Sequence, residues 1–401
     1  MNLIAKMLRQ ARWLGLACVT LFLAACGGGT GSGGTGIVRV SMTDAPSCYE
    51  HVYVTVSRVS IHRSATAEPN DGGWSHIDVA PQRVDLLTLT NGVLQELGEA
   101  SVPAGRYSQI RLVLAPNGGT EPYANAVVLP GASAEIPLDT PSGQQSGLKL
   151  NAHLDVADGQ VLDVVLDFDA CKSVVQAGNS GKYLLKPVIS VIPLLSSAGQ
   201  AVEGYVARSI ATGPDTATVT LQQGGAVVRA TQPDPQTGRF VLSPVPVGTY
   251  TLVVTAPNRA TAVLTGVTVS ETSRTMVNAQ GTPIDPPVSP TAVADGTVNE
   301  TPAPAGGVDA TVRALQNVGG GFVEVASQRI GGAAGETSVG YELNLPTAAP
   351  VSAAYAAGTG SITFTPASGA AGQYRLEASV PGKAAKTVDL TALPATEDFD
   401  F

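Results

Sequence analysis

The chain has 401 residues, of which 44% are hydrophobic and 14% are charged, a composition typical of a folded protein and not of a disordered one. Its formal net charge is −9, which makes it a poor match for nucleic acid or for anionic lipid headgroups, and we expect no nucleic-acid partner. With 45 glycines, 28 prolines and no sustained helical periodicity, the sequence predicts an all-β fold of tandem antiparallel β-sandwich domains.

Residues 1–25 have the organisation of a secretory signal peptide. Three cations, Lys6, Arg9 and Arg12, precede a mostly apolar segment from Trp13 to Ala25. This segment is too short to cross a bilayer core, which needs about 20 residues. Removal of residues 1–25 takes away three cations and no anion, so the net charge changes from −9 to −12.

The end of this segment, Leu23-Ala24-Ala25-Cys26, resembles the bacterial lipobox. The resemblance implies that Cys26 carries acyl chains such as palmitate and becomes the mature N-terminus. More than one acyl chain gives stable attachment, so we expect a membrane partner through the lipid. An ordinary cleaved signal and an uncleaved anchor are the alternatives. Residues 26–36 then comprise the lipidated cysteine and a flexible Gly-rich tether.

The residue after Cys26 bears on the membrane in which the anchor sits. It is Gly27, whereas an aspartate at this position signals retention at the inner membrane in the enteric sorting pattern. We therefore expect a lipid-anchored protein of the cell envelope, with the outer membrane favoured over the inner.

Residues 37–196 are predicted to form a first β-rich domain. Val52, Val54 and Val56 alternate on one face, and the parity then changes to Val59 and Ile61, which predicts a β-bulge near Ser57. The domain resembles a family of unknown function found directly behind the lipobox of bacterial lipoproteins. The segments that carry the resemblance are Met42–Pro46, Gly105–Leu112, Asp167–Asp169 and Leu184–Ile189.

Two cysteines of this domain are predicted to form a disulfide. Cys18 is removed with the signal peptide and Cys26 is assigned to the lipid, which leaves Cys48 and Cys171. An even remainder in an exported protein is typical of a disulfide. Two reduced, buried thiols are the alternative.

Residues 197–281 resemble the carboxypeptidase regulatory-like module, a small transthyretin-like β-sandwich related to a carbohydrate-binding fold. The segments that carry the resemblance are Val202–Val206, Ala217–Val219, Gly238–Phe240 and Val245–Leu252. A Pro-rich segment follows at 282–292, and its composition predicts a stiff linker.

Residues 293–393 are predicted to be a divergent, expanded copy of the preceding sandwich. Gly372, Tyr374 and Leu376 repeat Gly248, Tyr250 and Leu252 with the same spacing. Residues upstream of these match the preceding sandwich at a shorter separation along the chain than Gly372, Tyr374 and Leu376 do. This difference predicts an insertion between Gly319 and Gly360. Residues 394–401 are predicted to be a frayed acidic tail. A related Gly-x-Tyr triplet, Gly105-Arg106-Tyr107, occurs in the first domain.

Two groups of residues are candidates for ligand binding. Asp163, Asp167 and Asp169 share one face of a predicted strand, where they could hold calcium or form the solvated face of the sheet. Trp74 follows a loop sequence and, together with Tyr123, is a candidate platform for a sugar ring. For Trp74 the alternative is an edge residue that packs beneath its loop.

The sequence contains no nucleophile-elbow motif, zinc-protease helix motif or phosphate loop, so we expect no enzyme and no cofactor. Two function classes remain. The first is a non-catalytic envelope lipoprotein that binds carbohydrate or a partner protein of the envelope. The second is a structural or accessory spacer of an envelope complex, with no small ligand. Sandwich folds host both classes, so the fold does not choose between them.

Replacement of Cys26 by serine should release the protein from the membrane, because serine cannot accept the lipid at this position. The measurement is membrane fractionation of cells that express either form. Unchanged partition of the Cys26→Ser variant into the membrane fraction would contradict the lipobox assignment.

Overall fold

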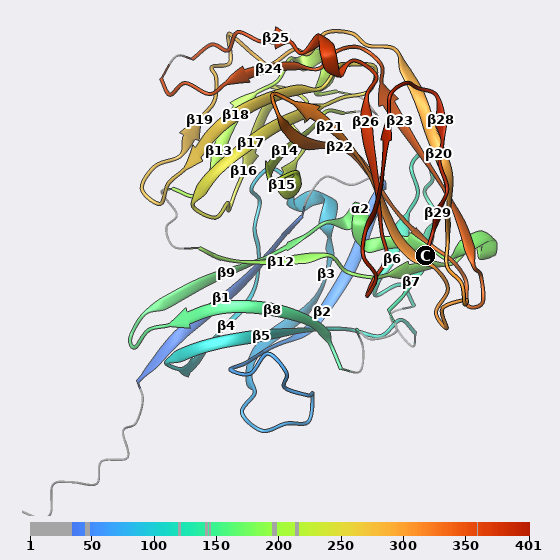
Figure 1. The fold of residues 1–401 in the computed structure, drawn as a ribbon. Coiled ribbons are helices and arrows are strands. Elements are labelled where there is room, and N and C mark those ends of the chain that lie inside the picture. Colours follow the sequence, from blue (N-terminus) through green and yellow to red (C-terminus); the bar gives the residue numbers. More distant parts are fainter. Residues whose placement is uncertain are drawn as a thin grey trace, which may run out of the picture.

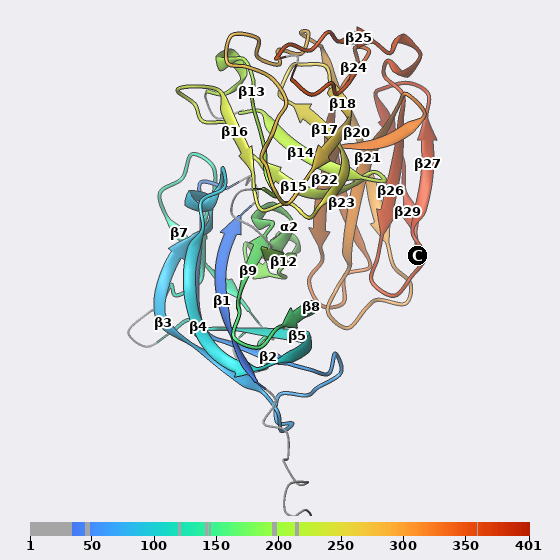
Figure 2. The same ribbon diagram turned by 90° about the vertical axis from the view of Figure 1, so that its left-hand side faces the viewer.

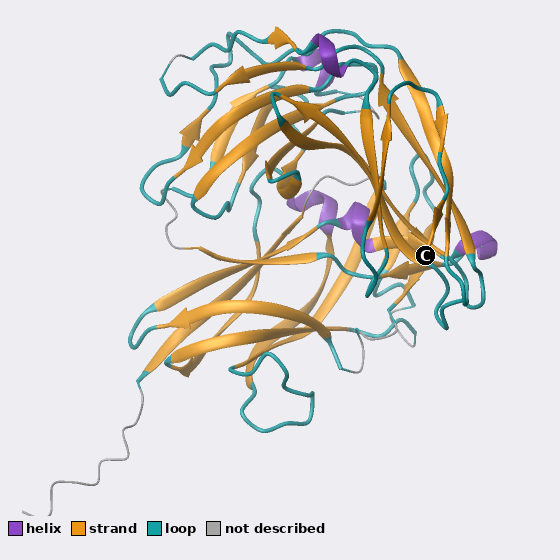
Figure 3. Cartoon of the chain, viewed as in Figure 1, coloured by secondary structure: helices purple, strands orange, loops and turns teal. Residues whose placement is uncertain are grey.

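The computed structural model describes residues 34–44, 49–118, 122–140, 143, 146–194, 199–212, 216–358 and 360–401. Strands dominate this part of the chain, and its helices contain four residues or fewer (Figure 3). The predicted all-β fold is therefore confirmed. The sheets are mixed, because each domain contains parallel strand pairs as well as antiparallel ones. Within the described ranges, no helix has the length and apolar character needed to span a membrane.

The first domain packs two sheets around one hydrophobic core (Figure 1). One sheet has the order β12-β9-β1-β4, with β1 (Thr35–Asp44), β4 (Gln95–Pro103), β9 (Val161–Phe168) and β12 (Ile189–Leu194). The other has the order β10-β11-β7-β6-β2-β5-β8, with β3 beside β2. Its strands are β2 (His51–His62), β3 (Ser75–Asp85), β5 (Gly105–Leu114), β6 (Ala126–Val128), β7 (Glu135–Asp139), β8 (Leu148–Val156), β10 (Val174–Gln176) and β11 (Tyr183–Leu185).

Strand β2 shows how the sequence pattern produces this sandwich. Val52, Val54 and Val56 are fully buried, as the alternation predicts. The register of β2 against both neighbours shifts between Val56 and Arg58, which confirms the predicted bulge. Short helices η1 (Leu86–Leu89), α2 (Ala170–Ser173) and η2 (Gly178–Ser180) lie in the connections.

The second domain is a smaller sandwich around its own core. One sheet has the order β16-β13-β19, with β13 (Val202–Tyr205), β16 (Arg239–Leu242) and β19 (Thr275–Met276). The other begins β15-β14-β17-β18, with β14 (Thr218–Gln223), β15 (Ala226–Thr231), β17 (Gly248–Thr255) and β18 (Ala262–Val269). The helical turn η3 (Arg208–Ile210) follows β13.

The third domain repeats the strand order of the second. One sheet has the order β23-β20-β28, with β29 also paired to β20, and the other has the order β22-β21-β26-β27. The strands are β20 (Thr291–Asn299), β21 (Asp309–Val318), β22 (Gly321–Gly331), β23 (Ser338–Pro346), β26 (Tyr374–Ser379), β27 (Lys386–Leu390), β28 (Ala395–Thr396) and β29 (Phe399–Asp400). Even the parallel pairing of the last short strand recurs, β19 with β13 and β28 with β20.

The insertion in the third domain adds strands to the second. The connection from β23 to β26 spans 347–373, whereas the matching connection from β16 to β17 spans 243–247. It contains β24 (Val351–Ala354), β25 (Thr365–Pro366) and η4 (Ser368–Ala370). Strand β24 pairs in parallel with β18, and the two added strands lie at the top of Figure 1 beside the second domain. Val351 is buried in the core of the second domain.

A buried tyrosine hydroxyl explains the Gly-x-Tyr triplets. Each tyrosine lies near the start of a strand and donates to the carbonyl oxygen of a proline: Tyr107 to Pro103 (2.8 Å), Tyr250 to Pro246 (2.7 Å) and Tyr374 to Pro346 (2.6 Å). This is the geometry of a tyrosine corner. In the third domain the proline lies before the insertion, so the insertion loops out while the hydrogen bond is kept.

The Pro-rich segment predicted as a linker at 282–292 packs against the second domain instead. Ile284 is 2% exposed, and its backbone pairs with Tyr205 and Ala207. Ala260 donates to the carbonyl of Pro287 (2.8 Å). The buried side chains of Ile284 and Pro286 and these backbone hydrogen bonds hold the segment on the sandwich until β20 begins at Thr291.

The prediction of a frayed acidic tail at 394–401 is wrong. β28 and β29 pair with β20, and Phe399 is 2% exposed in the core of the third domain. Alternation along the strand places Phe399 inside, while the neighbouring Asp398 accepts hydrogen bonds from the backbone and hydroxyl of Thr297. The last residues therefore complete the sandwich.

Phe399→Ala should lower the free energy of unfolding of the third domain by about 3–5 kcal/mol, because it leaves a cavity beneath Tyr341 in a closed core. Phe401→Ala, at a half-exposed position, should cost clearly less. Chemical denaturation of both variants tests this. Equal, small losses would show that the C-terminal strands do not contribute to the core.

Candidate functional site

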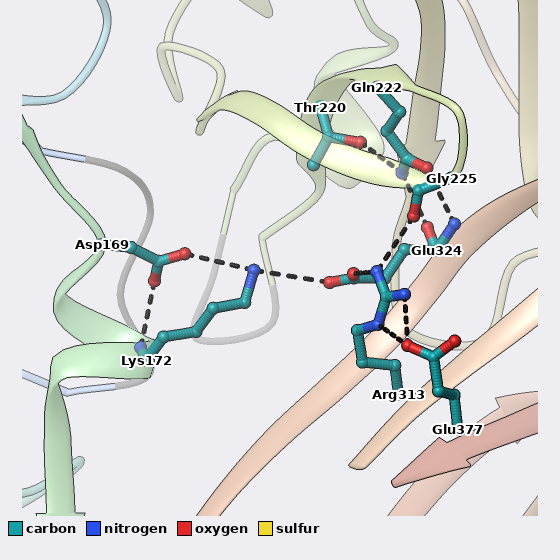
Figure 4. Close-up of polar contacts among 8 residues, drawn as sticks. All are labelled: Asp169, Lys172, Thr220, Gln222, Gly225, Arg313, Glu324 and Glu377. Carbon is teal, nitrogen blue, oxygen red and sulfur yellow. Dashed lines mark hydrogen bonds and ion pairs between the residues drawn. The ribbon is translucent and has the colours of Figure 1, made fainter. Parts of the chain in front are cut away.

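The three domains meet around Glu324 of β22, whose side chain is 7% exposed. Its carboxylate lies 3.4 Å from Lys172 Nζ of the first domain and 3.0 Å from Arg313 Nη1 of the third. Its backbone is bound by Gln222 of the second domain. Figure 4 shows these groups and their partners as one continuous series of polar contacts.

Gln222 joins the second domain to the edge of the third. Its Nε2 donates to the carbonyl of Glu324 (2.8 Å), and its Oε1 accepts from the Glu324 backbone N–H (2.7 Å). β22 is the edge strand of its sheet, so the side-chain amide takes the place of a neighbouring strand there. Gln222 follows the register shift after Leu221 in β14, and its Nε2 also donates to Thr220 (2.9 Å).

Arg313 of β21 binds three partners at this junction. Its guanidinium donates twice to Glu377 Oε1, from Nη2 (2.6 Å) and from Nε (3.1 Å). Nη1 donates both to Glu324 and to the carbonyl of Gly225 in the second domain (3.1 Å). The planar guanidinium of arginine holds several N–H donors in a fixed arrangement, so this one side chain can bind partners in both domains.

Lys172 carries the contact to the first domain. Asp169 caps α2, because its Oδ1 accepts from the backbone N–H of Lys172 (3.0 Å), and its Oδ2 lies 3.3 Å from Lys172 Nζ. Burial alone would lower the pKa of Lys172, but the carboxylates of Asp169 and Glu324 outweigh it and hold the pKa above its ordinary value. The ammonium group is therefore charged at neutral pH.

A second set of charges links the first and third domains beside this one. Arg329 Nη1 donates to the carbonyls of Lys172 (3.1 Å) and Lys186 (2.9 Å). Asp309 pairs with Arg329 and with Lys186 Nζ (3.0 Å). Burial works against the charged form of Asp309, yet its hydrogen bonds and charge interactions with these two cations lower its pKa below the ordinary value.

The first and second domains are joined by a buried ion pair between Asp167 and Arg229. The two side chains are 7% and 2% exposed. Arg229 Nη2 also donates to Thr43 (3.1 Å) and to the carbonyl of Ser243 (2.9 Å). Burial lowers the pKa of Arg229 to about 10, with the nearby Asp44 carboxylate opposing the shift, so the guanidinium remains charged at neutral pH.

A cavity of about 620 Å³ lies beside Glu324, and residues from all three domains line it. Its lining is rich in hydroxyl and amide groups: Gln176, Thr216, Thr218, Thr220, Gln232, Thr255, Ser327 and Gln328. Tyr49 and Tyr183 contribute aromatic rings from the first domain. Thr218 and Thr255 are paired across β14 and β17, and within the described part of the chain their hydroxyls have no hydrogen-bond partner.

The structure separates the three aspartates predicted as one set. Asp163 pairs with Arg39 (3.3 Å), Asp167 with Arg229, and Asp169 with Lys172. Among the described residues, no group of three or more histidine, cysteine, aspartate or glutamate side chains is placed to hold a metal ion. The alternative of a solvated face fails for Asp167, because the second domain covers that end of β9.

Trp74 and Tyr123 lie away from the junction. Trp74 is half-buried: its indole N–H donates to the carbonyl of Glu68 (3.0 Å), and its ring packs beside His62 (4.9 Å between ring centroids). It thus closes the loop between β2 and β3, as the alternative reading predicts. Tyr123 is 43% exposed, and its carbonyl accepts from Arg83 (2.8 Å).

Cys26 and Cys48 lie outside the described residues, so the lipid anchor and the disulfide stay predictions. Described residues on both sides of Cys48 nevertheless contact residues on both sides of Cys171. Asp44 accepts a hydrogen bond from Ala170 N–H (3.1 Å), and the Tyr49 hydroxyl donates to the carbonyl of Val174 (3.2 Å). The chain on both sides of Cys48 is therefore held against α2, which contains Cys171.

Glu324, Lys172 and Gln222 were not predicted from the sequence. A local signal exists for Gln222, because two glutamines end an otherwise alternating strand, Thr218–Gln223. Glu324 reads as an ordinary outward-facing residue between Val323 and Val325. Its partners lie in other domains, and no sequence spacing relates them.

Arg229→Ala should lower the free energy of unfolding by about 3–5 kcal/mol, because it leaves the carboxylates of Asp167 and Asp44 buried without their cation. The exposed Arg58, changed to alanine as a matched control, should alter it by no more than about 0.5 kcal/mol. Denaturation followed by the fluorescence of Trp74 measures both. Equal stability of the two variants would contradict the proposed importance of the ion pair.

Comparison with solved structures gives weak likenesses. A type II cohesin–X-dockerin complex from Acetivibrio cellulolyticus is 25% identical over 21% of this chain and 56% of that one, with a TM-score of 0.18. The Bacillus anthracis TIE protein is 11% identical over 92% of this chain and 50% of that one, with a TM-score of 0.16. BcpA, the major pilin subunit of Bacillus cereus, is 14% identical over 92% and 98%, with a TM-score of 0.13. This chain spans about half the length of the first two.

No curated protein matches the chain. A family model does match the first domain, over residues 35–187, and its description is "Domain of unknown function (DUF4382)". This confirms the resemblance to a family of unknown function that the sequence predicts for this part of the chain. Residues 35–187, which form most of the first domain, contain a DUF4382 domain.

Proposed function

We propose that this protein is a non-catalytic lipoprotein of the bacterial cell envelope that binds carbohydrate in the cavity at the junction of its three domains. The observation that carries the proposal is the lining of that cavity by neutral hydroxyl and amide side chains with two tyrosines. Sugars present hydroxyl groups to such side chains and C–H faces to aromatic rings. No cofactor takes part.

The surrounding charges support binding over catalysis. Three charged residues of the cavity wall, Asp169, Lys172 and Glu324, are used in fixed contacts between elements. The Tyr49 pKa is raised to about 12, chiefly by burial, so its hydroxyl is neutral and stays bound to the carbonyl of Val174, and its ring is the part that the cavity offers to a ligand. The resemblance of residues 197–281 to a carbohydrate-binding-like fold is consistent with this function.

The position of β1 supports attachment through Cys26. In Figures 1 and 2, β1 begins at the end of the first domain that lies farthest from the other two domains. Acyl chains on Cys26 would hold that end at the membrane and keep the cavity away from it. The residue after Cys26 favours the outer membrane, as stated above.

A structural spacer of an envelope complex is the second candidate function. The buried Asp167–Arg229 pair and the contacts of Glu324 favour it, because they connect all three domains. A spacer needs this rigidity but no ligand in the cavity, so ligand binding separates the two functions.

The test is a glycan and peptidoglycan-fragment array probed with the detergent-extracted full-length protein. The variant Thr218→Val/Thr255→Val removes two open hydroxyls from the cavity and keeps β-branched side chains in both strands. We expect it to weaken binding at least tenfold, since each lost hydrogen bond costs about 1 kcal/mol. Thr249→Val, at an exposed position of β17 outside the cavity, is the matched control and should bind normally.

Binding that both variants retain would contradict the assignment to this cavity. Failure of the unmodified protein to bind any array component, together with co-purification of specific envelope proteins, would favour the spacer.

A further inference from the structure

A second cavity lies in the third domain, and none of its lining residues lines the junction cavity. It has a volume of about 660 Å³ and is bounded by the β21–β22 hairpin, the start of β26, the end of β27 and the η4 segment of the insertion. Small-molecule sites fall in this range of volumes. Gln316, which is 1% exposed, fixes the η4 wall by donating from Nε2 to the carbonyl of Ala370 (2.9 Å).

The side chains of Phe322, Arg375 and Asp389 are the groups of this cavity, called the groove below, that are best placed to bind a ligand. Arg375 and Asp389 are directly opposite each other on β26 and β27, and they form two hydrogen bonds, of 2.6 and 3.0 Å. The guanidinium carbon of Arg375 lies 4.3 Å from the centroid of the Phe322 ring. The ring and the carboxylate therefore hold the guanidinium in one orientation. Asp389 is 66% exposed, so the pair is open to solvent.

The remaining hydrogen-bonding capacity of the pair faces outward. Within the described residues, Nε and Nη2 of Arg375 donate to Asp389, and Nη1 donates no hydrogen bond. Each carboxylate oxygen of Asp389 accepts one hydrogen bond from Arg375 and retains a further lone pair. A ligand with two adjacent hydroxyl groups can donate to the carboxylate and accept from the guanidinium. Asn317, Ser368, Gln373 and Thr391 add amide and hydroxyl groups around them.

Comparison with the second domain shows that these residues belong to the third copy alone. Counted from the hairpin glycines, Val227 occupies the position of Phe322. Thr251 occupies the position of Arg375, because Thr251 pairs with β14 and Arg375 pairs with the equivalent strand, β21. The shared fold therefore does not require the aromatic ring or the guanidinium, and the insertion that supplies η4 is likewise missing from the second domain.

We propose that this groove is a second binding site, for a neutral sugar ring with two adjacent hydroxyl groups. The opposite charges of Arg375 and Asp389 cancel, which favours a neutral ligand over an anion. Pro366 and Ala367 of the insertion, with the part of Phe322 that Arg375 does not cover, provide the apolar contact for the C–H face of the sugar ring. The groove shares no residue with the junction cavity, so this site stands independently of the function proposed above.

The experiment is ligand-observed NMR and calorimetry with the detergent-extracted full-length protein and a panel of cellobiose, maltose, lactose and chitobiose. At least one disaccharide should bind. Phe322→Val and Arg375→Thr, which restore the residues of the second domain, should each weaken it at least tenfold. Asp389→Asn keeps the shape of the side chain and should also weaken it. Thermal unfolding confirms that each variant is folded.

The junction variant Thr218→Val/Thr255→Val serves as the control and should leave this binding unchanged. Loss of binding in the junction variant alone would overturn the groove while leaving the junction site intact. Absence of binding to every disaccharide, or full binding by Phe322→Val, Arg375→Thr and Asp389→Asn, would also overturn the proposal.

Discussion

Burial of the Glu324 carboxylate is the constraint on which the arrangement of the three domains depends. A buried carboxylate is costly unless cations and hydrogen bonds compensate it. Glu324 obtains its compensation from Lys172 in the first domain and Arg313 in its own, while Gln222 of the second domain satisfies its backbone. Rotation of one domain against the others would break at least one of these contacts and leave a charge or a strand edge unsatisfied. The junction therefore selects one relative orientation.

The second and third domains have the same strand order and are also bound to each other. The tyrosine hydroxyl that closes each sandwich still reaches a proline carbonyl, although the insertion now separates Tyr374 from Pro346. The inserted residues of the third domain extend the sheet of the second domain, because β24 pairs with β18. An apolar cluster of Val253, Val263, Val318 and Val323 lies between the two sandwiches. The tyrosine hydrogen bond that closes each sandwich is thus present in both domains, while the long connection of the third domain binds it to the second.

The sequence could predict what is local. Alternation of apolar residues located β2 and its bulge, and repeated triplets located the copies, because both depend on backbone periodicity and turn geometry. Composition predicted the wrong local structure at two places where a buried apolar residue holds the chain against a domain. Phe399 inserts into a core despite its acidic neighbours, and Ile284 holds a Pro-rich segment on the second domain. The partners of Asp167 and Glu324 could not be predicted, since they come from other domains and no spacing along the chain encodes them.

Rigidity also bears on how such a protein would bind. When flexible linkers join two domains, the distance between their binding sites varies. A ligand held at one site then meets the other site at a lower effective concentration. Here the buried charges fix the third domain relative to the first, so the junction cavity and the groove around Arg375 keep a constant separation. Two sites at a constant separation would favour a repetitive ligand whose spacing matches it. Envelope polysaccharides are repetitive, so the two sites proposed above would together select a polysaccharide by its repeat length as well as by its sugar.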